Sequence, residues 1–408
     1  MLAQPLIEAA LTLIFAKMRT IYNSKVGKRQ RDFLGTLFGV IFAHQGRANF
    51  TNLARYSVLH EQTFRRHFGR CFDCLAFNLV LLRLRAHPDE TLIGVFDTSF
   101  LPKSGKHTWG LDKFFSHAAK AVRTGLEVSL LGVIAIERRR ALVLDATQTP
   151  PGLSSKATGA DYSRIDFYLE QITDVLDFLP QVLYWIGDGY YAKKKIFDGL
   201  TTHHKHLITK LRCDANLRFV IAPERRRGRY GGKVRFTDFD GPTSDFEAVG
   251  CLQDLPHVRL YTTHVNSEHF RRDLRIVVLH NERDGSYLVL CSTDLDQAPD
   301  ELVHFYRLRY QLEFIIRDAK QHLGLSQCQS RSQAGLDFHL NASVAAVNLG
   351  RLVSERLSIS LVSLLRESYN TFLVDRLLSE LSLGAEFGLT DPIIAGIIRI
   401  GRIGRMAA

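Results

Sequence analysis

Four polar residues in the last third of the chain are spaced for one face of a helix. Tyr306 is followed by Arg309, Glu313 and Lys320, at steps of three, four and seven residues. Because an α-helix has 3.6 residues per turn, these steps place a phenol, a guanidinium, a carboxylate and an ammonium in a single stripe. Such a stripe is either a solvated face with intrahelical ion pairs or a site for a charged substrate.

Two aspartates follow short apolar runs that are typical of buried strands. Asp97 ends the run TLIGVFD, and Asp188 ends the run QVLYWIGD with a glycine on each side. A carboxylate that ends a strand emerges at the edge of the sheet, where a metal ion and a substrate can reach it. An aspartate in this place is also a common turn or capping residue, so neither position identifies a site by itself.

The segment that contains both aspartates, residues 89–212, predicts an α/β domain. Apolar runs predict strands over 91–96, 126–136, 141–145, 181–186 and 206–210. Amphipathic patterns predict helices over 162–178 and 192–200. Three strands followed by helix, strand, helix and strand is the order of the RNase H-like fold, a mixed sheet flanked by helices.

The next segment, residues 213–300, predicts a β-rich insertion. Its expected strands cover 258–263, 274–279 and 287–291, with Asp284-Gly285 as a hairpin turn. The chain is then predicted to be helical. Residues 301–345 complete the α/β domain with the polar stripe, and residues 346–408 form a C-terminal helical region. The helices of that last region either dimerise or cover the core.

The first segment, residues 1–88, predicts a helical DNA-binding domain. Two short helical patterns, 51–56 and 61–68, are separated by a tight turn and resemble a helix-turn-helix. Arg65 and Arg66 are then expected to face DNA. The expected buried seam consists of Leu53, Ala54, Val58 and Phe64. An ordinary helical hairpin with a basic face would show the same pattern.

The composition favours a soluble protein with a polyanionic partner. The chain has 408 residues, of which 53 are Lys or Arg and 42 are Asp or Glu, so the formal net charge is +11. Such an excess favours nucleic acid, although many basic proteins bind none. We expect no membrane partner, because no run of eighteen apolar residues is present. The apolar start of the chain lacks a preceding basic region and predicts an amphipathic helix.

These motifs resemble a known family. The stripe Tyr306, Arg309, Glu313 and Lys320 is similar to the Y-(2)-R-(3)-E-(6)-K signature of DDE transposases from one large group of bacterial insertion sequences. The resemblance covers about residues 90–345. It includes Asp97-Thr98-Ser99, Gly187-Asp188-Gly189, the β-insertion and the segment LGLSQCQSRS.

The resemblance implies a DNA transposase that cleaves insertion-sequence ends and joins them to a target, by cut-and-paste through DNA hairpins. Asp97, Asp188 and Glu313 would be the catalytic residues and would hold two Mg²⁺ or Mn²⁺ ions through oxygen ligands. Tyr306, Arg309 and Lys320 would bind phosphates near the cleaved end. Tyr287 stands roughly where the family places an aromatic that stacks on a flipped base, although the family more often has Trp there.

The resemblance also implies the partners. These are double-stranded DNA with terminal inverted repeats and a target DNA, bound by a homodimer on paired ends at the bacterial nucleoid in the cytoplasm. Two alternatives stay open: a catalytically inactive, transposase-derived DNA-binding protein, and another RNase H-like nuclease that cuts but does not join. The complete carboxylate triad and the complete polar stripe argue against the first of these alternatives.

Overall fold

At the centre of the fold lies a mixed sheet with the strand order β4–β3–β1–β5–β6. A computed structural model describes residues 3–87, 89–153, 162–221, 230–236, 239, 244–381 and 391–400. The central strands are β1 (Leu92–Pro102), β3 (Ala121–Ala135), β4 (Arg140–Gln148), β5 (Tyr184–Ile186) and β6 (His206–Leu211). Strand β1 is antiparallel to β3 and parallel to β5, and β5 is parallel to β6. The RNase H-like mixed sheet predicted from the sequence is therefore confirmed.

A glycine allows the two middle strands of this sheet to approach each other closely. Gly94 of β1 pairs with Trp185 of β5. A Cβ atom at residue 94 would lie 2.2 Å from the Trp185 ring, so no larger residue fits there without displacing the indole. One strand of this region escaped prediction: β2 (Asp112–Ser116), which pairs with the beginning of β3.

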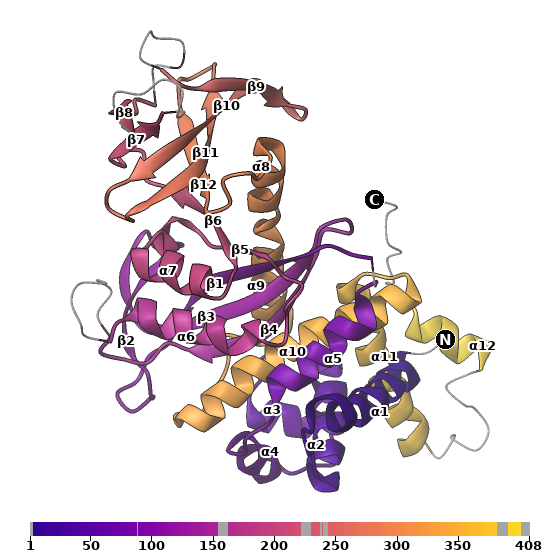
Figure 1. Ribbon diagram of the computed structural model, residues 1–408. Helices are drawn as coiled ribbons and strands as arrows, with labels where there is room; N and C mark the ends of the chain where they lie inside the picture. Colours follow the sequence, from indigo (N-terminus) through magenta and orange to yellow (C-terminus); the bar gives the residue numbers. More distant parts are fainter. Residues whose placement is uncertain are drawn as a thin grey trace.

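The insertion continues the same sheet. Its strands are β7 (Leu217–Val220), β8 (Tyr230–Lys233), β9 (Glu247–Leu252), β10 (Leu255–Ser267), β11 (Arg272–Asn281) and β12 (Tyr287–Ser292). Strand β12 pairs with β6, so the described strands form one twelve-stranded sheet whose far end is the insertion (Figure 1). The three predicted strands and their turn, with Gly285 at φ +69°, are confirmed. The short strands β7, β8 and β9 were not predicted.

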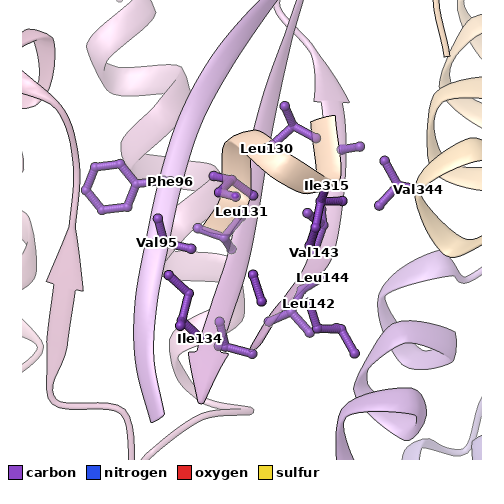
Figure 2. Packing of buried hydrophobic residues seen from close by; sticks show 14 of the residues in the cluster. Val95, Phe96, Leu130, Leu131, Ile134, Leu142, Val143, Leu144, Ile315 and Val344 are labelled. Atoms are coloured by element: carbon purple, nitrogen blue, oxygen red, sulfur yellow. The ribbon is translucent and has the colours of Figure 1, made fainter. Parts of the chain in front are cut away.

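Helices cover the central strands. They are α6 (Arg164–Leu176), α7 (Lys194–Thr202), α8 (Pro299–Leu308), α9 (Tyr310–His322) and α10 (Gln333–Leu357). A 3₁₀ turn, η1 (Gly189–Tyr191), precedes α7. Ile315 of α9 and Val344 of α10 lie beside strand β4, near Leu142, Val143 and Leu144 (Figure 2). These buried contacts fix α9, which carries Glu313, against the sheet.

The N-terminal residues form five helices, as predicted. These are α1 (Ala3–Tyr22), α2 (Lys28–Ala43), α3 (Phe50–Arg55), α4 (Glu61–Phe68) and α5 (Cys74–Arg85). They pack against α10 and α11 (Leu361–Glu380) and share one continuous hydrophobic core with the sheet (Figure 1). The C-terminal region also contains α12 (Pro392–Ile398). None of the helices in the described ranges is long and apolar enough to cross a membrane.

The predicted seam of the α3–α4 pair is correct at three positions and wrong at one. Leu53 and Phe64 are fully buried, and Ala54 is packed against the core. Val58, in contrast, is 98% exposed. The reason is the turn itself: the Ser57 hydroxyl accepts a hydrogen bond from the Leu59 amide at 3.1 Å, which leaves Val58 at the tip of the turn.

Candidate active site

The pairing of β1 with β5 sets Asp97 and Asp188 side by side. Val95 of β1 is the register partner of Ile186 of β5, and the two strands are parallel. Each aspartate follows its partner residue by two positions, so both carboxylates lie at the same level along the sheet. One expectation was wrong: Asp97 does not end its strand, because backbone pairing with β3 carries β1 on to Pro102.

Arg309 links Asp97 to the third carboxylate. Its Nη1 atom donates to Asp97 Oδ2 at 2.7 Å, and its Nη2 atom lies 2.9 Å from Glu313 Oε1. The Arg309 side chain is 13% exposed and the Asp97 side chain 16%, so this contact is largely shielded from water. A planar guanidinium suits such a position because it offers several N–H groups in a fixed geometry.

The carboxylates also influence one another electrostatically. Burial raises the pKa of Asp97 to about 7; Arg309 opposes this shift, while the negative charges of Asp188 and Glu313 reinforce it. All three acidic groups are therefore close enough to form a single electrostatic site. Burial also raises the pKa of Tyr306 to about 12, with Arg309 lowering and Asp188 raising it, so the phenol belongs to the same neighbourhood.

The polar stripe faces β1, even though the helix is interrupted. Arg309 lies between α8 and α9, and its backbone keeps helical angles of φ −49° and ψ −34°. Eleven residues further on, Lys320 donates to Ser99 Oγ at 2.8 Å and to the Phe100 carbonyl at 3.0 Å, both on β1. The predicted helical face is thus present, and two of its cations hold α9 to β1.

Asp188 is positioned by the backbone around it. Its Oδ1 atom accepts a hydrogen bond from the Tyr190 amide at 2.9 Å, and its carbonyl accepts one from the Thr209 hydroxyl at 2.7 Å. The flanking glycines are closely packed: a Cβ at Gly187 would clash with the Phe96 ring at 2.3 Å, and one at Gly189 would make a tight contact with the Lys210 carbonyl at 3.2 Å. Close packing therefore fixes the turn that presents Asp188.

The donor set suits a hard divalent cation in chemistry and charge. Three carboxylates influence one another at this site, and the pKa of Asp97 stays raised because Arg309 does not offset the whole cost of burying this carboxyl beside the other two. As arranged, however, no three His, Cys, Asp or Glu side chains of the described residues stand close enough to hold a metal ion. The guanidinium instead contacts two of the three acids.

The remaining predicted residues lie elsewhere. Tyr287, at the beginning of β12, packs against the Phe236 ring at 5.8 Å, and its hydroxyl donates to the Cys213 carbonyl at 3.5 Å. Arg65 and Arg66 are exposed on α4. Among the described contacts, Arg65 lies near Phe50 and Glu61, and none of the three residues contacts Asp97, Asp188 or Glu313.

Sequence analysis missed a fourth carboxylate near the site. Glu127 on β3 is buried, and it accepts hydrogen bonds from the Tyr168 hydroxyl at 2.5 Å and the Thr149 hydroxyl at 3.0 Å. Burial raises its pKa, and these two hydrogen bonds oppose the shift. The signal in the sequence was a lone acid in the apolar run LEVSLLGVIA. Because its hydrogen-bond partners lie inside the fold, its role is to join α6 to the sheet.

The sheet order, with one carboxylate on β1, one just after β5 and one on α9, defines a class: RNase H-like domains with an acidic site. Residues 133–349, more than half of the chain, match the transposase DDE domain family. The chain belongs to the DDE transposases, so its general function is DNA transposition. The match spans the positions of Asp188 and Glu313 and begins after Asp97. No curated protein matches the sequence significantly.

Proposed function

We propose that the protein is an active transposase that cleaves the ends of an insertion sequence and joins them to a target, by cut-and-paste through DNA hairpins. The observation that carries this proposal is the convergence of Asp97, Asp188 and Glu313 on one site through β1, β5 and α9. The proposal includes the division of the chain at residues 88, 212, 300 and 345 and a homodimer on paired DNA ends at the bacterial nucleoid.

In this proposal the three acids hold two Mg²⁺ or Mn²⁺ ions. Ions held there would supply the positive charge that lowers the pKa of an attacking water or 3′-hydroxyl and offsets the charge on the leaving 3′-oxygen. Asp188 is already oriented by the Tyr190 amide, so it needs the least rearrangement. Asp97 and Glu313 must first release Arg309, which contacts both of them. The released guanidinium then binds a DNA phosphate, since phosphate accepts the same paired N–H groups as a carboxylate.

Other residues would hold the DNA around the reacting phosphate. Lys320 and Tyr306 contact neighbouring phosphates from the same face of the α8–α9 unit. Tyr287 stacks on a flipped base, for which its ring must leave the Phe236 side chain. Arg65 and Arg66 bind the terminal inverted repeat from α4, where both side chains are exposed.

A strand-transfer assay tests the proposal and separates its alternatives. The substrate is the DNA that flanks the gene, with its terminal inverted repeats, incubated with purified protein and Mg²⁺. We expect nicking, a hairpin intermediate and joined products. Nicking without joining would indicate another RNase H-like nuclease, and binding without nicking would indicate a retired, DNA-binding relative. Either result would overturn the proposal.

A further inference from the structure

A polar cavity lies between α4 and the α/β domain, apart from the carboxylates. Its volume is about 690 Å³, and residues from three elements line it: Arg65 of α4, Lys103 just after β1, and Arg331 in the segment between α9 and α10. Phe50, Ser330 and Ser332 also line it, and no acidic residue does. Helix α4 packs against α10 (Figure 1). The first turn of α10 borders the cavity through Ser332 and Gly335.

The contacts of Lys103 and Arg331 hold the cavity walls together without neutralising the charge of either side chain. The Lys103 ammonium donates to the Cys328 carbonyl, and the Arg331 carbonyl accepts a hydrogen bond from the Trp109 amide at 2.9 Å. Both bonds join the segment after β1 to the segment after α9. Across the described part of the chain, neither Lys103 nor Arg331 forms an ion pair.

Arg65 completes the arrangement from the other side. Its guanidinium lies over the Phe50 ring, 5.1 Å from the ring centre, at the cavity wall. The nearest carboxylate oxygen, on Glu61, is 3.7 Å away, which is long for a charge-assisted bond. Three cations around one concavity repel one another in the free protein, and a bound anion would relieve this repulsion.

We propose that this cavity is a binding site for one backbone phosphate of the terminal DNA. The ligand chemistry is that of a phosphodiester: Arg65, Lys103 and Arg331 supply the charge, and the Ser330 and Ser332 hydroxyls, 3.3 Å apart, supply neutral donors. The site joins three elements, because Lys103 follows the strand of Asp97 and Arg331 follows the helix of Glu313 and Lys320. One phosphate held there fixes the distance along the DNA between α4 and the carboxylates.

This inference rests on the proposed function, since it assumes that the bound polyanion is DNA. Its position favours backbone DNA over a free anion, because α4 exposes Arg66 next to the same surface. Contact with a backbone phosphate carries no base specificity of its own; it sets the register of the protein on the duplex.

The test compares the unaltered protein with the triple variant Arg65→Gln, Lys103→Gln and Arg331→Gln. Binding to the terminal DNA is measured between 50 and 200 mM salt, conditions over which phosphate contacts dominate the change in affinity. We expect binding about tenfold weaker and a salt slope shallower by about 0.9, the value for one lost phosphate contact. Arg356→Gln is the matched control, because this exposed arginine lies at the other end of α10, roughly 36 Å away.

A set of duplexes, each with one neutral methylphosphonate, locates the contact. At one position in the DNA, the methylphosphonate should weaken binding by the unaltered protein and have no effect on binding by the triple variant. A native salt slope in the triple variant, or no such coupled position, would overturn the inference. In a further arm, inorganic phosphate at millimolar concentration competes with the DNA. If phosphate weakens DNA binding by the unaltered protein but not by the triple variant, and no methylphosphonate position distinguishes the two proteins, the cavity binds a free anion. That result would also overturn the inference.

Failure of the proposed function gives a different result. In that case the unaltered protein would not nick the terminal DNA, whereas the salt slopes on plain duplex would still differ between the two proteins. If instead the protein nicks and joins the ends, and the unaltered protein and the triple variant have the same salt slope, only the inference about the cavity is refuted.

Discussion

The two sides of the carboxylate site are built in different ways. On the β1–α9 side, the guanidinium of Arg309 contacts both Asp97 and Glu313, and Asp97 also accepts a hydrogen bond from the Thr98 amide at 2.8 Å. On the β5 side, Asp188 is held by the amide of Tyr190 and by a turn in which Gly187 packs directly against the Phe96 ring. One side depends on ion pairs, and the other depends on backbone geometry.

This difference separates what can change from what is fixed. An ion pair can exchange its partner for water, a cation or a phosphate, because each supplies similar electrostatic stabilisation. A turn that packs a glycine against Phe96 has no comparable alternative. We therefore expect the β1–α9 side to rearrange when metal and DNA bind, and the β5 side to provide the fixed reference.

The largest expected effect is on the cleavage rate, and it should be similar for carboxylates from both sides of the site. Asp97→Ala, Asp188→Ala and Glu313→Ala should each lower the cleavage rate by at least about 10³-fold, because each removes a ligand that stabilises charge in the transition state. Cleavage of terminal DNA is measured under single-turnover conditions with Mg²⁺, alongside binding. Binding should persist in all three variants. Normal turnover by one of them would remove that residue from the triad.

The second prediction concerns stability, for which the two sides of the site should differ. Arg309→Gln should lower the free energy of unfolding by about 2–4 kcal/mol in the absence of metal, because it leaves a buried carboxylate, Asp97, without its cation. Mg²⁺ should restore part of the loss. Urea denaturation with and without Mg²⁺ measures both quantities.

The comparison variant for this prediction is Asp188→Asn. It keeps the size of the side chain and an oxygen that accepts from the Tyr190 amide, so its effect without metal should stay within about 1 kcal/mol. If Asp188→Asn destabilises the protein as much as Arg309→Gln does, the two sides do not differ as described.

The ion-pair partner of Arg309 could not be predicted from the sequence. Helical periodicity predicted that Tyr306, Arg309, Glu313 and Lys320 share a face, because steps of three and four residues dictate it. It did not predict that Arg309 pairs with Asp97, which lies 212 residues earlier in the chain. The resemblance to DDE transposases implied that this arginine binds DNA phosphates. Only the folded sheet shows which partner it has in the free protein.

The fold shows the same contrast between local and distant information. Apolar runs predicted the central strands, since buried strands must be apolar on both faces. They did not predict β9, whose residues are almost all exposed and whose order comes from pairing with β10. Likewise, the hydrophobicity of Val58 predicted burial, but the Ser57 turn directs it into solvent. Pairing and turn chemistry decided the outcome in both cases.

The third prediction tests the fixed side directly. Gly187→Ala should lower the free energy of unfolding by about 1–3 kcal/mol, because its Cβ would lie 2.3 Å from the Phe96 ring and one of them must move. The matched control is Gly35→Ala in α2, where nothing lies within 4 Å and alanine favours the helix. Thermal unfolding of both variants is sufficient. Equal stability of the two would show that the turn around Asp188 can adapt.

The smallest expected effect concerns Lys320, the second cation that joins α9 to β1. Its ammonium bonds Ser99 and the Phe100 carbonyl in the free protein, so, like Arg309, it must change partner to reach a phosphate. Lys320→Ala should make the salt slope of end binding shallower by about 0.9 and leave cleavage at saturating DNA within about tenfold. Arg356→Ala, which removes an exposed cation near the end of α10, serves as the control. An unchanged slope would mean that Lys320 keeps its β1 contacts in the complex and belongs, with Asp188, to the fixed part of the site.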